Sequence, residues 1–383
     1  MNTPNTAQLI GGVPSENTAL FHRIRFSAGD PAAWILKPDG TSLLIIRDIE
    51  ADRARRDAIV DAVQTPADHV PERGLSGDRA TATAQATAEC LKAMKLDRVL
   101  VDRSTPFIYV HELIEAGLSV QYDSELGVVD RRSKSQDELS ALQQAQSDTE
   151  RVMLEVCQLI ARASPDATGI LQHEGSEITS ERVRLRIDQS LLALGYDNPG
   201  SIVAGGPQAA DCHAHGTGPI RTSEPVIIDI FPHSKQTHYN GDCTRTVVHG
   251  DIPDEVLRMH AAVVEAKAAG IAAINPEATG ELVHQATIGI ITSHGYHAGL
   301  PPEGAEPSWC GMVHGTGHGV GLLVHEPPLL DFKGPQLVAG DVLTVEPGLY
   351  SRAIGGIRVE DMVVVTDAGC LNFNHLPEGL SWT

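Results

Sequence analysis

Hydrophobic and polar positions follow two different periods along the chain. Short apolar runs bounded by Gly, Pro or Asp predict strands, and longer stretches with apolar residues every three or four positions predict helices. In the first third of the chain, the expected strands are residues 33–36, 42–46, 98–102 and 118–122, and the expected helices are residues 80–94 and 111–116. The turn Pro38-Asp39-Gly40 makes the first two strands a hairpin. This alternation of strands and helices predicts an α/β N-terminal domain.

A charged segment, Arg131-Arg132-Ser133-Lys134-Ser135, follows this region. Ser135 and Glu138 have the spacing of a capping box, which predicts the start of a long amphipathic helix that ends near Ala163. We therefore expect two domains, residues 1–134 and residues 135–383. Further helices are expected at residues 179–194, 254–273 and 279–293, with the remaining strands between and after them.

Composition and charge exclude several classes of protein. The 383 residues are 42% hydrophobic and 21% charged, as in an ordinary globular protein of two or three domains. The net charge of 29 − 50 = −21 argues against nucleic acid or an anionic membrane as a partner, because both need cationic patches. No segment approaches the roughly 20 apolar residues of a membrane span. Residues 1–15 lack the pattern of a secretory signal, and the six cysteines are widely spaced like reduced thiols, so we expect a cytoplasmic protein.

Five side chains of the types that bind metals occur in the second half of the chain, and the four acidic ones lie in or beside strand-like apolar runs. They are Asp229, Asp242, His318, Glu346 and Glu360. A carboxylate in a buried strand is costly unless its charge is compensated. Taken singly, Asp242 could cap a turn and His318 could be structural. Taken together, four carboxylates and one imidazole predict a shared divalent metal centre.

The order of these residues suggests how they meet. Asp229 and Asp242 fit two adjacent strands joined by a polar turn at residues 234–240, and Glu346 and Glu360 fit a second hairpin that passes through Gly355-Gly356. Two metals about 3.5–4 Å apart would hold a hydroxide and polarise a carbonyl. Oxygen-rich ligation with one imidazole favours Mn²⁺, with Co²⁺, Fe²⁺ and Zn²⁺ as alternatives.

The flanking motifs make a family resemblance specific. They are Ile227-Ile228-Asp229, Asp242-Cys243-Thr244-Arg245-Thr246, His314-Gly315-Thr316-Gly317-His318-Gly319-Val320-Gly321, Val324-His325-Glu326, Thr344-Val345-Glu346-Pro347-Gly348 and Gly356-Ile357-Arg358-Val359-Glu360-Asp361. From about residue 137 onwards the chain resembles the pita-bread metallopeptidases, which include Xaa-Pro aminopeptidases, prolidases and methionine aminopeptidases. The N-terminal domain resembles the creatinase-like domain of prolidases only in its pattern, and its presence argues against a methionine aminopeptidase.

The resemblance implies an α+β pita-bread catalytic domain behind a creatinase-like N-terminal domain, with two divalent metals held by the five residues above. It also implies that His325 faces the substrate carbonyl. An upstream site histidine is expected near residues 212–215, where His213 aligns best and His215 is the second candidate. The neighbouring Cys212 and Cys243 are interpreted as small buried fillers.

Two departures from the family pattern are visible. Such proteins often have Gly soon after the first aspartate, whereas Ile230-Phe231-Pro232 stands here and is expected to reshape the wall of the site. The long helix has Gln143-Gln144-Ala145 where Arg-Glu-Ala is usual. Neither departure removes an expected catalytic group.

The resulting hypothesis is an exopeptidase of the aminopeptidase P type, which hydrolyses the first bond of Xaa-Pro peptides with a free N-terminus. Glu346 is the expected base, His325 and His213 would stabilise the intermediate, and Arg358 would support Glu360 from the same strand face. A prolidase-type dipeptidase is the alternative, although the only cation of the loop 327–340 is Lys333.

Two further alternatives use the same fold: a creatinase-like C–N hydrolase and a non-catalytic binding module. The complete ligand set argues against both. The resemblance also implies a homodimer, in which the N-terminal domain packs over a neighbouring subunit's cleft.

Overall fold

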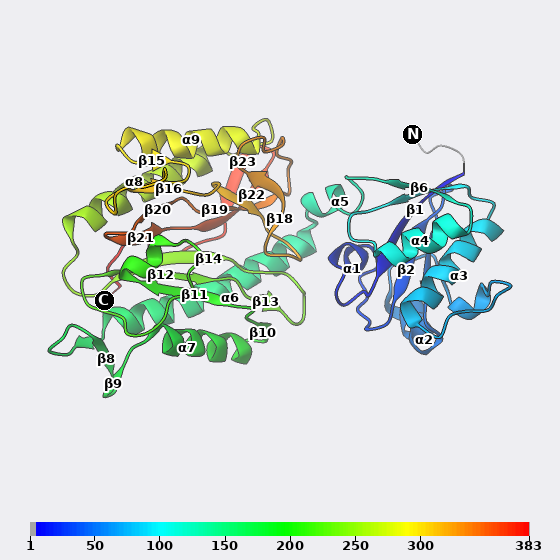
Figure 1. The fold of residues 1–383 in the computed structure, drawn as a ribbon, viewed down its shortest axis with the longest axis horizontal. Coiled ribbons are helices and arrows are strands. Elements are labelled where there is room, and N and C mark those ends of the chain that lie inside the picture. The colour runs from blue at the N-terminus through cyan, green and yellow to red at the C-terminus, as the bar shows by residue number, and fades with distance from the viewer. Residues whose placement is uncertain (1–4, 383) are drawn as a thin grey trace. The chain divides into compact units, whose positions relative to one another are not determined.

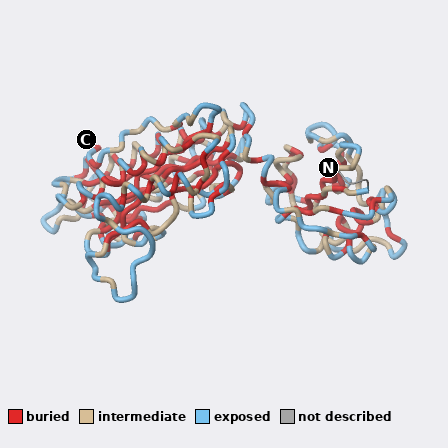
Figure 2. Tube along the Cα trace, turned by 90° about the horizontal axis from the view of Figure 1, so that it is seen from above, coloured by how far each residue is buried: buried red, intermediate tan, exposed pale blue. Residues whose placement is uncertain are grey.

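The computed structural model describes residues 5–382, and the chain divides into two compact units, Met1–Arg131 and Arg132–Thr383 (Figure 1). Within each unit, the buried residues gather in the interior and the exposed ones lie in the outer segments (Figure 2). No helix in the described part of the chain combines the length and the apolar character that crossing a bilayer requires.

The first unit is built on one six-stranded mixed sheet. Its strands, in spatial order, are β4 (Ala62–Gln64), β3 (Ser42–Ile46), β2 (Ala32–Leu36), β1 (Thr6–Gly12), β5 (Arg98–Val101) and β6 (Ser119–Tyr122). β2 and β3 form the expected antiparallel hairpin, while β1, β5 and β6 run parallel to one another.

Helices cover both faces of this sheet because successive strand residues point to opposite sides. Leu9 packs with residues of α3 (Arg79–Ala93) and α4 (Phe107–Glu115), whereas Ile10 packs with residues of α1 (Thr18–Ile24) and α2 (Asp48–Asp57). The predicted α/β class of this domain is therefore confirmed.

Two elements of the first unit differ from the expectation. The polar sequence at the N-terminus gives no strand signal, yet Thr6–Gly12 is a central strand; residues 1–4 lie outside the described part. Gly11 is needed there because a Cβ would lie 2.9 Å from the ring of Tyr109. α4 begins four residues earlier than expected, after Pro106, because proline fits the start of a helix but not its interior.

The second unit opens with α6 (Gln136–Ala161), and the predicted capping box between Ser135 and Glu138 is present. α6 and α7 (Ser180–Ala193) pack on a sheet of β11 (Ser201–Gly205), β12 (Pro225–Ile230) and β14 (Cys243–Val248). The shared apolar core fixes both helices to one side of the strands.

The other helix pair, α8 (Asp254–Ala273) and α9 (Gly280–Ser293), packs on two further sheets. One consists of β15 (His297–Ala298), β16 (Gly311–Met312), β20 (Gly348–Ser351) and β21 (Gly355–Arg358), and the other of β18 (Glu326–Leu330), β17 (Gly317–Gly319), β19 (Val342–Val345), β22 (Asp361–Thr366) and β23 (Gly369–Asn372). The strands thus lie between two helix pairs (Figure 1).

The remaining elements are short. They are α5 (Val129–Arg132), the 3-10 turns η1 (Pro66–Asp68) and η2 (Gly206–Ala210), and the strands β7 (Ser164–Pro165), β8 (Leu171–His173), β9 (Ser176–Glu177), β10 (Tyr196–Asp197) and β13 (His233–Ser234). The long helices predicted in this unit are all present, each within about two residues of its expected ends.

Candidate metal centre

All five metal-type side chains line one cavity of about 390 Å³ in the second unit. Carboxylate oxygens of Asp229, Asp242 and Glu360 lie within 4.8 Å of one another. Nε2 of His318 lies 3.7 Å from Oδ2 of Asp242 and 3.3 Å from Oε1 of Glu346. The structure therefore brings together residues that are up to 131 positions apart in sequence (360 − 229).

The first two aspartates are placed by one strand pair. β12 and β14 are antiparallel, with Asp229 opposite Thr244, and Asp242 directly precedes β14. The side chain of Gln146, on α6, holds the backbone of Asp242 from both sides: it accepts the N–H at 2.8 Å and donates to the carbonyl at 2.7 Å. A Cβ at Gly241 would lie 2.1 Å from Oγ1 of Thr149, so only glycine allows α6 to approach this closely.

The two glutamates lie where the chain passes from one strand pair to another. β20 and β21 form the expected hairpin, with Gly348 opposite Arg358, and β19 pairs with β22, with Val345 opposite Asp361. Glu346 lies between β19 and β20, and Glu360 lies between β21 and β22. Both side chains line the cavity.

His318 lies in β17, between two glycines. A Cβ at Gly317 would lie 2.0 Å from the carbonyl oxygen of Thr344, which explains the glycine at this close approach. The hydroxyl of Thr344 accepts the backbone N–H of His318 at 3.0 Å and donates to Oε1 of Glu346 at 3.3 Å. One side chain therefore sets the positions of two others.

The electrostatics of the cluster show a deficit of positive charge. Burial raises the pKa of Asp242 and of Glu360 well above the usual range, and neighbouring carboxylates add to both shifts. Burial also raises the pKa of Asp229, against the opposing effect of Arg358. At Glu346 burial is outweighed by the hydrogen bond and charge of His318 together with the effects of His314 and Arg358, and the pKa falls to about 2.

One buried carboxylate oxygen shows this shortage of positive charge directly. Oδ1 of Asp229 has no hydrogen-bond partner among the described residues, in a site whose other carboxylates face it. Buried polar atoms are almost always paired. A divalent cation would satisfy this oxygen and relieve the repulsion, so the residues present fit a metal.

Arg358 differs in one respect from the expectation. Its Nη2 donates directly to Oδ2 of Asp229 at 2.7 Å, rather than to Glu360. Both side chains line the cavity, so they do share a face, but the direct ion pair of Arg358 is with Asp229 on β12. The link to Glu360 runs through Thr244, which accepts from Nε of Arg358 at 3.2 Å and donates to Oε2 of Glu360 at 2.8 Å.

Histidines surround the open side of the cluster. The ring of His325 meets that of His318 edge-to-face at 4.2 Å between centroids and lines the cavity. His213 and His215 both line it too. Both are exposed, and Nδ1 of His215 lies 3.2 Å from the carbonyl oxygen of Ser201. Burial lowers the pKa of His325, and His318 and His213 lower it further.

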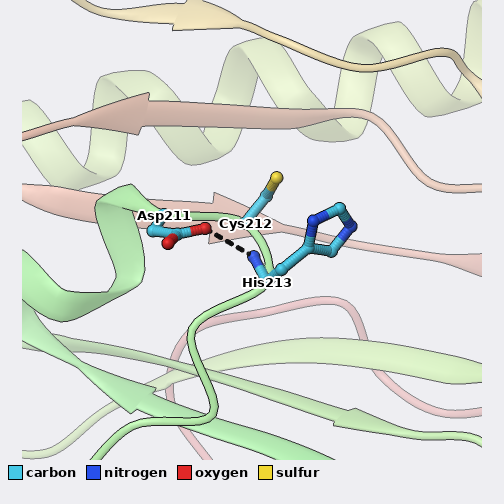
Figure 3. A group of neighbouring side chains, drawn as sticks. All are labelled: Asp211, Cys212 and His213. Carbon is cyan, nitrogen blue, oxygen red and sulfur yellow. Dashed lines mark hydrogen bonds between the residues drawn. The ribbon is translucent and has the colours of Figure 1, made fainter.

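The segment that carries His213 also forms a group of potential metal ligands, Asp211, Cys212 and His213 (Figure 3). Oδ1 of Asp211 accepts the backbone N–H of His213 at 3.0 Å, a turn within three consecutive residues. The expectation of two buried cysteine fillers is half right: Cys243 is buried, but Cys212 is half-buried and lines the cavity, because it lies on this turn.

Two contacts of residues that line the cavity, both with Tyr350, were not predicted. His314 places Nε2 2.7 Å from the hydroxyl of Tyr350, and the same hydroxyl accepts from Nη1 of Arg358 at 2.9 Å. His314 opens the same glycine-rich motif as His318, which could have singled it out. Tyr350 has no local signal, because only the hairpin β20–β21 brings it to Arg358.

The walls of the cavity are mixed. Ile202 and Phe231 flank Asp229 on one side, so the Ile-Phe-Pro departure does reach the wall as expected. Leu329, in β18, and Asp331, directly after it, also line the cavity. Lys333, the cation considered for a dipeptide carboxylate, is not among the described lining residues.

The comparisons with known proteins agree with this geometry. The model of metallopeptidase family M24 matches residues 140–367, which is more than half of the chain. The probable dipeptidase PepE of Mycobacterium bovis is 30% identical over 254 residues, 65% of this chain and 60% of that protein. The Xaa-Pro aminopeptidase 1 of Streptomyces coelicolor is 32% identical over 291 residues, 68% of this chain and 56% of that protein.

The chain thus matches about 60% of the length of such curated relatives. Among solved structures, the Xaa-Pro dipeptidase from Bacillus anthracis superposes with a TM-score of 0.80 at 22% identity, covering 98% of this chain and 94% of that one. This likeness confirms the predicted two-domain fold, with its pita-bread catalytic domain. The matched family model and the fold together place the chain in metallopeptidase family M24.

Proposed function

We propose that the chain is a dinuclear-metal-dependent exopeptidase that hydrolyses the N-terminal bond of peptides, with Xaa-Pro peptides as the favoured substrates. One observation carries the proposal: four carboxylates and one imidazole from five separate segments, each in or beside a strand, converge on one cavity, with a buried oxygen of Asp229 left without a hydrogen-bond partner among the described residues. Such a cluster is unfavourable unless cations bind to it.

The proposed ligands are Asp229, Asp242, His318, Glu346 and Glu360. Their oxygen-rich character favours Mn²⁺, with Co²⁺, Fe²⁺ and Zn²⁺ as alternatives. When bound, two divalent metals would polarise the scissile carbonyl and acidify water. The buried position of Asp242 and Glu360 keeps bulk water from competing for these ligands.

The protein's own groups have distinct tasks in this proposal. Glu346, whose low pKa keeps it ionised, is placed to accept a proton from the attacking water. His325 and His213, on the open side of the cluster, would donate hydrogen bonds to the developing oxyanion. Arg358 holds Asp229 in position through its 2.7 Å contact and is a positioning residue.

An aminopeptidase remains the main assignment and a prolidase-type dipeptidase the second. The relatives include both kinds, a probable dipeptidase and an Xaa-Pro aminopeptidase. A creatinase-like C–N hydrolase and a non-catalytic module are disfavoured because all five ligands are retained.

Assembly and location complete the proposal. We assign chemistry to residues 135–383 and length selection to residues 1–134, within a homodimer. All six cysteines are free, which suits the cytoplasm. Light scattering should give twice the chain mass of 40.8 kDa; a monomer with full activity and unchanged length preference would exclude the dimer role.

The function is tested with protein freed of metal by a chelator and reloaded with Mn²⁺. An Xaa-Pro-Xaa tripeptide should be cleaved after its first residue, and the matched Xaa-Ala-Xaa tripeptide more slowly. An N-acetylated Xaa-Pro-Xaa peptide is the control for the free amine and should resist hydrolysis. Cleavage of the acetylated peptide at an equal rate would contradict an aminopeptidase.

A further inference from the structure

One acidic residue lines the cavity without belonging to the metal-type cluster. Asp331 follows β18 directly, and its side chain is 43% exposed. The other lining carboxylates in the described part of the chain are the four proposed ligands. Asp331 is therefore a negative charge on the wall that the metals would not neutralise by direct ligation.

Local contacts fix the position of this carboxylate. Oδ1 accepts the backbone N–H of Phe332 at 2.7 Å. The side chain also lies against Gly315, where a Cβ would come within 3.2 Å of its Cβ, Cγ and Oδ2. Gly315 lines the cavity as well, so Asp331 is held at the wall.

No cation among residues 5–382 forms an ion pair with Asp331 apart from His284, whose Nε2 lies 3.5 Å away. Burial lowers the pKa of His284, and its Nδ1 lies 2.9 Å from the hydroxyl of Thr316, so the ring is neutral at neutral pH. The charge of Asp331 is consequently left to act on whatever enters the cavity.

The described part of the cavity also offers no free lysine or arginine for a substrate carboxylate. Arg358 is the only Lys or Arg among the described lining residues. Its side chain is 4% exposed and bound to Asp229 and Tyr350. A dipeptide would bring its carboxylate within one residue of the attacked bond, on a wall that carries the same sign of charge.

We infer that Asp331 selects against substrates with a free carboxylate on the second residue, so that the preferred class is Xaa-Pro followed by a further residue or an amide. This inference rests on the proposed function and deepens it, because it assigns the choice between aminopeptidase and dipeptidase to one side chain.

The test compares an Xaa-Pro dipeptide with its C-terminal amide, which has the same size but lacks the negative charge. With Mn²⁺-loaded protein, kcat/KM should be roughly three- to tenfold higher for the amide, the size expected for a partly screened like charge. Asp331→Asn should bring the two values together. Glu277→Gln is the matched control, since it removes an exposed carboxylate outside the cavity, and should leave the ratio unchanged.

Salt provides a readout that needs no variant. Raising the ionic strength should narrow the ratio in the unmodified protein, because the repulsion is screened. A dipeptide cleaved as fast as its amide, or an unchanged ratio in Asp331→Asn, would overturn the inference alone. Failure of the metal-loaded protein to cleave any Xaa-Pro substrate would overturn the proposed function as well.

Discussion

Glu360 and Asp361 are neighbours in sequence and are almost equally buried, with 1% and 2% of their surface exposed. Their pKa values nevertheless shift in opposite directions. Burial raises the pKa of Glu360, and the carboxylates of Glu346 and Asp229 raise it further. At Asp361 burial is outweighed by Lys267 and Arg245, and the pKa falls. A buried carboxylate whose charge is compensated by cations or hydrogen-bond donors of the chain is structural, and one that lacks this compensation is a candidate site for a bound cation.

Cations and an amide of the chain compensate the charge of Asp361. Asp361 accepts from Nη2 of Arg245 at 2.9 Å, from Nδ2 of Asn372 at 2.8 Å and from the ammonium of Lys267. Arg245 also donates to the backbone carbonyl of Glu360. The network therefore supports the backbone that carries a proposed ligand.

The first unit follows the same rule. Buried Asp102 accepts the backbone N–H groups of Ser104 and Thr105, each at 3.0 Å, and both hydroxyls as well. Within the described residues, the groups with metal-type spacing all lie in the second unit. This difference distinguishes the unit to which we assign the chemistry from the other one.

The largest effect is expected from removing a ligand. Glu360→Gln and His318→Ala should each lower the metal content measured by mass spectrometry and reduce hydrolysis to the rate of the metal-free protein, because the Lewis acid is lost. Asp361→Asn is the neighbouring control, and its folded fraction should retain metal. Full metal content in Glu360→Gln would break the distinction between the two carboxylates.

A smaller loss of rate is expected at His325. His325→Ala should reduce kcat by roughly two to four orders of magnitude, as for the loss of a transition-state donor, while the metal stays bound. If the variant instead loses its metal, the roles of His325 and His318 have been interchanged.

Replacing Glu360 and replacing Asp361 should change the free energy of unfolding in opposite directions. Asp361→Asn leaves Lys267 and Arg245 without their buried counter-charge and should lower the free energy of unfolding by about 3–5 kcal/mol. Glu360→Gln in chelated protein at pH 8 should raise it, since the raised pKa of Glu360 means that its charge opposes folding there. Denaturant titration measures both, and changes of the same sign would refute the comparison.

A pH dependence of metal affinity is also expected. The pKa values of Asp242, Glu360 and His318 are all raised in the metal-free protein, so protons compete with the metal as pH falls. Affinity should weaken from pH 8 to pH 6, about tenfold per pH unit for each proton released. Calorimetry in buffers of different ionisation enthalpy would count these protons, and a pH-independent affinity would contradict the assignment.

Much of the fold follows from local sequence. The periodic helices and the capping box at Ser135 carry their own signals, and their ends match closely. β1 carries no such signal, because its Gly11 is dictated by the ring of Tyr109, which is distant in sequence. The start of α4 depends on Pro106, a boundary signal that hydrophobic periodicity alone does not register.

The residues of the candidate site also divide into those that the sequence reveals and those that it does not. The five metal-type residues are recognisable because each is a costly charge or an imidazole in a marked motif. Gln146 and Tyr350 are not, since their contacts with Asp242 and Arg358 exist only after α6 and the β20–β21 hairpin have packed. The direct partner of Arg358, Asp229, is not recognisable from sequence for the same reason, because the two side chains come from strands 129 positions apart.

The central claim is that the unsatisfied carboxylates bind the metals that support peptide hydrolysis. The most direct measurement is a titration of chelated protein with Mn²⁺, in which bound metal per chain and hydrolysis of an Xaa-Pro-Xaa tripeptide are followed together. The account predicts no activity before addition and a rise that ends at two ions per chain. Full activity in the metal-free protein, or metal binding that leaves the Glu360→Gln variant as active as the unmodified chain, would contradict it.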